Sequence, residues 1–223
     1  MKISYIHLVQ HIQENPTIEQ VSESLFQLGH EHEIEDNFFD IEFTPNRGDC
    51  LSIKGLLRDL AVFYTIDFNT DIYLENLDEL KIDFENLSKT ICPKISFLKL
   101  EIDEIPKSYK NSLSDYFSDL SLNKNNFFTD VSNYLSYETG QPTHCYDANI
   151  IKGKLIFHEI EKNEDFETLL DKKISLRGKN AVFSLNNKVI NLAGVVGGKS
   201  TSCSTNTKKV IVECAFFQPE AII

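Results

Sequence analysis

The sequence of 223 residues lacks several features that would place it in a specialised class of protein. No apolar run approaches the ~18 residues that a membrane-spanning helix needs. The opening segment Met1–His7 is soon followed by His11 and Glu14, which argues against a secretory signal peptide. The five cysteines are scattered and include no CxxC pair, so neither a disulfide framework nor a zinc knuckle is predicted, and no metal site is expected. A reducing cytoplasm is therefore the expected location.

Basic residues are scarce in the first two thirds of the chain. Residues 1–150 contain 11 Lys and Arg against 26 Asp and Glu, whereas residues 151–223 contain 11 against 8. A chain with a net charge of −12 does not supply the broad basic surface that drives non-specific nucleic-acid binding. Any contact with RNA is expected to be local or supplied by a partner. Acidity that only keeps the protein soluble is an equally open interpretation.

The composition, with 41% hydrophobic and 25% charged residues, is that of a globular protein. The length fits one large domain or two small ones. Residue patterns predict an α+β fold, in which a small N-terminal α/β module at residues 1–75 precedes a mixed, mostly β domain at residues 92–223. A polar, acidic connector at residues 76–91 is predicted to separate them.

The first 60 residues contain two predicted helices and one predicted strand. Thr17 and Gln20 stand at the spacing of a capping box, and apolar residues then recur at helical intervals. Gly29 suits the left-handed residue that ends such a helix. Residues 39–43 alternate between aromatic or aliphatic and acidic side chains, which predicts a half-buried strand. A second apolar helical face runs from Ile53 to Ala61.

A turn is predicted between that strand and the second helix, at Thr44–Ser52, because the segment is dense in turn-forming residues. Asp49 is expected to cap the helix. Arg47 has two open interpretations: it is an ordinary turn residue, or its guanidinium is a fixed donor fork for a phosphate or for a partner's carboxylate.

The second module is predicted to begin with a strand at residues 98–102 and a helix with an apolar stripe from Tyr109 to Leu120. Beyond Gly140 the alternation of side chains indicates strands at 154–160, 174–177, 181–185, 188–192 and 210–217. Asn186 and Asn187 between two of these strands are typical of a tight hairpin turn.

Two short motifs suggest chemistry but fit it poorly. His144 next to Cys145 suggests a cysteine nucleophile, but a working pair is usually assembled from distant segments. A His144 that positions water in a pocket and a purely structural His144 both remain open. The Gly198-Lys199-Ser200 sequence resembles the end of a phosphate loop, yet Ala193 stands at the position of the first glycine and no helix-forming segment follows.

Glu213 is the one charged residue in the apolar run Val210–Phe217. Burying a carboxylate without a partner would cost several kcal/mol, so this one is expected to be hydrogen-bonded, paired or protonated. Two interpretations are open: a buried structural ion pair, or an acceptor that faces a cavity and binds a ligand hydroxyl.

Five collinear stretches resemble the β subunit of bacterial phenylalanyl-tRNA synthetase; they are Phe39–Ser52, Asp130–Leu135, Gly140–His144, Ala193–Gly198 and Glu213–Pro219. The resemblance implies that residues 1–75 match the family's N-terminal module and residues 92–223 its editing domain, truncated at the C-terminus. The oligonucleotide-binding barrel that the family inserts between the positions of Glu35 and Phe38 is missing, as are its C-terminal modules. A fragment or a reduced form of the β subunit is therefore expected.

In that family the editing domain hydrolyses tyrosine that was wrongly attached to the phenylalanine tRNA. The resemblance implies catalytic roles for His144 and Glu213, with Glu213 recognising the tyrosine hydroxyl. It implies a substrate-binding wall formed by Gly194, Gly197 and Gly198. It also implies no cofactor in this chain, with ATP and magnesium belonging to the complete complex of two α and two β subunits. The implied partners are the α subunit and the phenylalanine tRNA, without membrane or DNA.

The chemistry of editing agrees with these residue types. An apolar pocket cannot strongly reject tyrosine in favour of phenylalanine, so a second pocket that accepts a hydrogen bond from the extra hydroxyl is useful. Backbone amides beside the glycines are expected to stabilise the oxyanion. The chain alone is not expected to aminoacylate. The alternatives are a non-catalytic module that docks on the α subunit or tRNA, and an independent hydrolase of free mischarged tRNA.

Overall fold

Contacts divide the chain into two compact units. The computed structural model describes residues 1–68 and 76–222. Unit 1 comprises Met1–Asn76, Pro106–Lys124 and Asp130–Pro142, and unit 2 comprises Leu77–Ile105, Asn125–Thr129 and Thr143–Ile223. Both units combine helices and strands, which confirms the α+β class. The domain division at residues 75 and 92 stays a prediction; contacts place residues 106–124 and 130–142 with the N-terminal residues.

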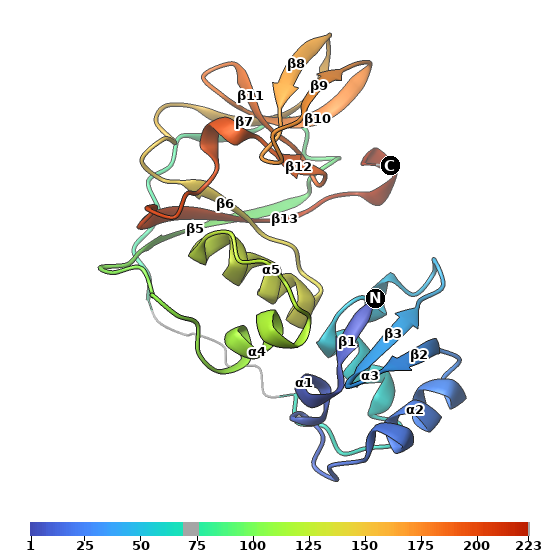
Figure 1. Ribbon diagram of the computed structural model, residues 1–223. Coiled ribbons are helices and arrows are strands. Elements are labelled where there is room, and N and C mark those ends of the chain that lie inside the picture. The colour runs from blue at the N-terminus through green and yellow to red at the C-terminus, as the bar shows by residue number, and fades with distance from the viewer. Residues whose placement is uncertain (69–75, 223) are drawn as a thin grey trace. The chain divides into compact units, whose positions relative to one another are not determined.

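Unit 1 is built on a three-stranded antiparallel sheet in the order β1-β3-β2. Figure 1 shows α2 and α3 beside this sheet, and the unit's core is formed by their apolar faces and the sheet. The elements of the unit are β1 (Lys2–Ser4), α1 (Tyr5–Val9), α2 (Ile18–Gln27), β2 (Glu31–Glu35), β3 (Phe38–Glu42), the 3-10 helix η1 (Gly48–Cys50), α3 (Ile53–Leu60), α4 (Asn111–Asp119) and most of α5 (Phe127–Thr139).

The predicted start and end of α2 are confirmed. The Thr17 hydroxyl accepts a hydrogen bond from the Gln20 backbone N–H, and the Gln20 side chain accepts one from the Thr17 N–H, which completes the capping box. Val21 and Leu25 are buried on the inner face of the helix. Gly29 adopts a φ of 80°, a conformation that residues with a side chain rarely adopt.

The turn between β3 and α3 is confirmed, but the predicted cap is wrong. Ser52 caps α3, because its side chain accepts a 3.0 Å hydrogen bond from the Gly55 N–H. Asp49 lies one turn earlier in η1, where its carboxylate binds the guanidinium groups of Arg47 and Arg58. Asp49 therefore lies too early in the chain to cap α3, and its carboxylate forms ion pairs instead.

The segment Asp130–Leu135, for which the sequence analysis predicted no element, lies within α5. Asp130 is fully buried there, and its carboxylate accepts a 2.6 Å hydrogen bond from the Tyr109 hydroxyl. The motif thus contributes an internal polar contact that joins two segments of unit 1. Its apolar periodicity is interrupted by such polar residues, which hides the helix from pattern analysis.

Unit 2 is mostly β, as predicted. A five-stranded sheet in the order β12-β11-β10-β7-β4 faces a three-stranded sheet in the order β5-β13-β6, and a core of aromatic and aliphatic residues fills the space between them (Figure 1). The elements are β4 (Phe84–Asn86), β5 (Lys94–Glu101), β6 (His144–Asp147), β7 (Leu155–Glu161), β8 (Glu164–Glu167), β9 (Lys173–Leu176), β10 (Lys179–Leu185), β11 (Lys188–Leu192), β12 (Val196–Gly197), η2 (Lys199–Thr201), β13 (Lys209–Phe216) and η3 (Pro219–Ala221).

Two features of unit 2 bear on the sequence-based predictions. Asn186 and Asn187 have φ values of 48° and 68° and join β10 to β11, which confirms the tight hairpin. The predicted connector at 76–91 is wrong in part, because it contains β4, which pairs in parallel with β7. Ile82 and Phe84 are spaced two residues apart and pack on the core of the unit, so burial of this alternating pair draws the segment into the sheet.

Within residues 1–68 and 76–222, no helix has the length and apolar character needed to cross a bilayer.

Candidate functional site

The two residues predicted to be catalytic lie opposite each other on neighbouring strands of unit 2. Antiparallel pairing of β6 with β13 sets His144 directly across from Glu213. Directly paired residues project their side chains from the same face of a sheet. Tyr146, two residues beyond His144, shares that face and belongs to the core between the two sheets. The structure therefore brings together two residues that are far apart in the sequence.

Glu213 is a buried carboxylate held by a hydrogen bond from a phenol. The residue is 5% exposed, and its Oε2 accepts a 2.6 Å bond from the Tyr146 hydroxyl. That hydroxyl accepts a 2.8 Å bond from the Asn191 side-chain amide on β11. Burial raises the pKa of Glu213 to about 7, although the bond from Tyr146 acts to lower it. The expectation that this carboxylate is buried and hydrogen-bonded is confirmed.

The His144 side chain packs against a neighbouring aromatic ring. Its ring lies edge-on to the Tyr146 ring, with centroids 4.5 Å apart. Its Nε2 atom is buried and has no hydrogen-bond partner among the residues that the structure describes. Burial lowers the pKa of His144 to about 4, so the imidazole is neutral at neutral pH. A neutral, unpartnered ring nitrogen is able to accept a hydrogen bond from water or donate one to a ligand, according to its tautomer.

The glycines of the predicted wall have different neighbours. A Cβ atom on Gly197 would lie 2.1 Å from Cε1 of His144, so only glycine allows this close approach of β12 to the ring. A Cβ atom on Gly198 would lie 2.4 Å from the Ile190 carbonyl oxygen. Gly194 has a φ of 70° and lies instead beside Phe217 and Ile222. Close backbone approach thus explains Gly197 and Gly198, whereas a left-handed turn explains Gly194.

The expected oxyanion donor beside the glycines is already engaged at one position, because the Gly198 N–H donates a 2.8 Å hydrogen bond to the Ile190 carbonyl. Sequence reasoning also missed Tyr146, which bonds Glu213, and Asn191, which bonds the Tyr146 hydroxyl. The spacing of two between His144 and Tyr146 was one available signal. The single amide in the apolar run of β11 was another.

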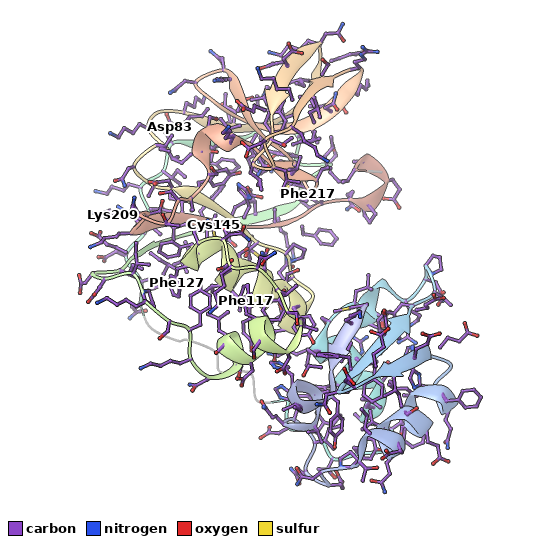
Figure 2. All side chains as sticks on the ribbon, viewed as in Figure 1. Asp83, Phe117, Phe127, Cys145, Lys209 and Phe217 are labelled. Carbon is purple, nitrogen blue, oxygen red and sulfur yellow. The ribbon has the colours of Figure 1, made fainter. Side chains whose placement is uncertain are left out.

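The alternative chemistries suggested by short motifs are not supported by the geometry. Cys145, labelled in Figure 2, lies on β6 next to His144, and neighbours along a strand point to opposite faces. Its thiol reaches the Phe128 carbonyl instead, at 3.7 Å. Lys199 of the Gly-Lys-Ser sequence binds the carboxylates of Glu167 and Asp171, and it lies in a short 3-10 helix rather than at the start of an α-helix.

Arg47 uses its donor fork within unit 1. Its guanidinium binds Asp49 at 3.1 Å, Asp59 at 2.6 Å and the Cys50 sulfur at 2.7 Å, while His30 bonds the same Asp59 oxygen at 3.0 Å. Burial raises the pKa of the Cys50 thiol to about 11. The arrangement accounts for Arg47 as a local structural ion pair and leaves a phosphate-binding role without support.

Comparison with known proteins agrees with the resemblance seen in the sequence. Phenylalanine–tRNA ligase beta subunits match this chain: the one from Ehrlichia canis (strain Jake) is 32% identical and covers 89% of the chain, and the one from Psychrobacter arcticus (strain DSM 17307 / VKM B-2377 / 273-4) is 31% identical and covers 85%. The matched regions are 26% and 24% of those proteins, so the chain spans about a quarter of their length.

A solved structure and a family model complete the comparison. The crystal structure of an N-terminal fragment of the phenylalanyl-tRNA synthetase beta-subunit from Pyrococcus horikoshii matches with a TM-score of 0.50 and 15% identity, over 100% of this chain and 69% of that one. At this identity the match supports the fold alone. The family model described as the B3/4 domain matches residues 101–223, which include β6, β12 and β13 with His144, Gly197 and Glu213. Because this model covers more than half of the sequence, the chain belongs to the B3/4 domain family.

Proposed function

We propose that this chain acts as part of a phenylalanine–tRNA ligase β subunit and that unit 2 recognises tyrosine wrongly esterified to the phenylalanine tRNA. The observation that carries the proposal is the buried Glu213 carboxylate, which already accepts a hydrogen bond from a phenol, that of Tyr146. A carboxylate offers about four acceptor positions, and Tyr146 uses one of them. A tyrosine ester would present a second phenol to the same group, whereas a phenylalanine ester would present none.

The reaction is hydrolysis of an ester. Water adds to the carbonyl carbon, the bond to the ribose oxygen breaks, and that oxygen leaves as a hydroxyl with a proton taken from the water. His144 Nε2 is suited to position this water, because the ring is neutral and the atom is buried without a partner among the described residues. Because Gly197 has no side chain, its strand, β12, is able to lie close to the His144 ring.

The aminoacylation activity of the complete ligase is proposed to reside outside this chain. Activation of phenylalanine with ATP and magnesium would belong to an α subunit, in a cytoplasmic assembly of two α and two β chains. The charge balance is consistent with tRNA contacts that are confined to the more basic region after residue 150.

The test compares two esters of the same tRNA. The 223-residue chain, combined with the α subunit of its own organism, is incubated with tyrosyl- and phenylalanyl-tRNA of the phenylalanine type. Faster hydrolysis of the tyrosyl ester is expected. Glu213→Ala is expected to slow that reaction about ten- to a hundredfold, since a hydrogen bond to a charged group contributes roughly 1.5–3 kcal/mol.

The matched control is Glu161→Ala, which removes an exposed glutamate from β7 in the same unit and is expected to leave the rate unchanged. Equal hydrolysis of the two esters, or an equal loss of rate in both variants, would show that Glu213 does not select the tyrosine hydroxyl.

A further inference from the structure

Two histidines and a glutamate gather in unit 1, away from the site described above. His7 lies in α1, His11 follows two residues after that helix, and Glu138 lies in the last turn of α5. His7 Nε2 is 2.6 Å from Glu138 Oε2, and His11 Nε2 is 3.6 Å from Glu138 Oε1. The side chains are 2%, 30% and 11% exposed, respectively, so the group is largely withdrawn from water but accessible beside His11.

The spacing of the two histidines supports a shared ligand. Residues four apart on a helical turn project to the same side, and the His11 N–H bonds the Leu8 carbonyl, which continues the turn beyond α1. Their nitrogens and a Glu138 oxygen all lie within 4.8 Å of one another.

The distances are close to those of a coordinated ion. Two atoms that each lie ~2.0–2.1 Å from a tetrahedral Zn²⁺ are about 3.3 Å apart. The 3.6 Å separation of His11 and Glu138 is near this value. The hydrogen-bonded pair His7 and Glu138, at 2.6 Å, has to open by less than 1 Å. The other ring nitrogen of His7, Nδ1, has no hydrogen-bond partner among residues 1–68 and 76–222, so no second hydrogen bond opposes this adjustment.

A second group of potential ligands in the same unit provides a contrast. His30, Cys50 and Asp59 also lie within 4.8 Å of one another, but the Arg47 guanidinium already binds both the thiol and the carboxylate. A fixed cation there takes the place that a metal ion would fill. Near the first group, Lys54 on α3 influences the pKa of Glu138 and of His11, but the Glu138 carboxylate is approached most closely by the two histidines.

We propose that His7, His11 and Glu138 bind one divalent transition-metal ion of the zinc class. Two imidazoles and one carboxylate are a ligand set that Zn²⁺ prefers, and a water molecule or an outside group would complete four-coordination. The ion would tie the first helix of the chain to the end of α5, across 131 residues of sequence. The site is separate from Glu213, so it stands or falls independently of the proposed editing function.

Cobalt provides the direct test, because Co²⁺ replaces Zn²⁺ and its visible absorption reports geometry and ligand type. The full chain is stripped with a chelator, titrated with Co²⁺, and then challenged with Zn²⁺. A single equivalent with the absorption of a four-coordinate nitrogen and oxygen site is expected, without the near-ultraviolet band of a thiolate ligand. Zn²⁺ is expected to displace the cobalt and to raise the melting temperature of the chain.

Two variants probe the ligands without disrupting the core. His11→Ala removes the most exposed ligand, and Glu138→Gln keeps the shape and hydrogen-bonding capacity of its side chain. Removing a group that only hydrogen-bonds to a metal ligand typically weakens metal binding roughly 10- to 100-fold. Because each of these variants removes a ligand itself, each is expected to weaken binding by more than that. The matched controls, His158→Ala and Cys50→Ser, are expected to bind as the unchanged chain does.

Two results would overturn the proposal. One is the absence of stoichiometric binding of either metal by a chain whose circular dichroism shows that it is folded. The other is binding that persists in both His11→Ala and Glu138→Gln, or that disappears in Cys50→Ser together with a thiolate band.

Discussion

Replacing Glu213 by glutamine is expected to stabilise unit 2 at neutral and alkaline pH. Glutamine has nearly the same shape, and its side-chain oxygen still accepts the hydrogen bond from Tyr146, so the packing between the two sheets is preserved. What the substitution removes is a charge that forms in a largely dry environment. The free energy of unfolding should therefore rise in the variant above about pH 4.5, where the carboxyl of the unfolded chain is ionised and burial penalises the same charge in the folded chain.

The magnitude follows from the pKa of the carboxyl in the two states. Burial raises the pKa of Glu213 from 4.5 to about 7 in the folded protein. Between these values the folded state holds a proton that the unfolded state has released, so stability falls as the pH rises from 4.5 to about 7 and stays lower above it. At about 1.4 kcal/mol for each tenfold change, the loss in the unchanged chain is roughly 3 kcal/mol. Glutamine avoids this loss.

The neighbouring histidine has the opposite effect, which determines how the measurement is designed. Burial lowers the pKa of His144 from 6.5 to about 4, so the unfolded state binds the proton first and stability rises with pH across that interval. The two dependences oppose each other between pH 4.5 and 6.5, so the unchanged chain alone conceals both. The difference between the chain and Glu213→Gln at each pH isolates the carboxylate.

Urea unfolding followed by circular dichroism, at a series of pH values from about 4.5 to 8, measures this difference. The variant should be about as stable as the unchanged chain at the acidic end and roughly 3 kcal/mol more stable at the alkaline end. Glu161→Gln, which neutralises an exposed glutamate of the same unit, should show no such trend. A stability difference that does not vary with pH would refute the reasoning, because the carboxylate would then not be titrating in a buried environment.

Two pairs of substitutions test the local geometry. Gly197→Ala should destabilise unit 2 by about 1–3 kcal/mol, since its Cβ would lie 2.1 Å from the His144 ring, whereas Gly48→Ala, with no atom within 4 Å of its Cβ, should be nearly neutral in the same thermal unfolding assay. Ser52→Ala should reduce the free energy of unfolding of unit 1 by about 0.5–2 kcal/mol through loss of the α3 cap. Asp49→Ala should have a smaller effect, since its ion pairs are exposed to solvent; the reverse order would restore Asp49 as the cap.

Features that depend on neighbouring residues could be predicted from the sequence. The capping box at Thr17 and Gln20, the left-handed Gly29 and the Asn186-Asn187 hairpin each follow from the conformational preferences of a few adjacent side chains. The burial of Glu213 was predictable for the same reason, because its strand is apolar on both sides of it.

Features that depend on partners distant in the sequence could not be predicted. Even over a short stretch, Ser52 rather than Asp49 caps α3 because the helix begins at Ile53, and the folded turn brings Arg47 and Arg58 to the Asp49 carboxylate. Asn191 orients Tyr146 only because β11 and β6 belong to facing sheets, and no local pattern contains that information. Residues 106–124 and 130–142 follow the predicted boundary at residue 92, yet contacts place them in unit 1, and no local pattern indicates which core their apolar side chains join.

The charge of Glu213 is difficult to explain by structure alone. Tyr146 needs an acceptor for its hydroxyl proton, and a neutral amide oxygen would serve that need without the cost of a buried charge. A carboxylate instead leaves further acceptor positions and no donor when it is ionised, which suits a second hydroxyl brought from outside. Sites that bind or react commonly retain such destabilising groups. His144, paired with Glu213 across β6 and β13, fits the same interpretation, because a ligand would supply the hydrogen bond that its Nε2 lacks among the described residues.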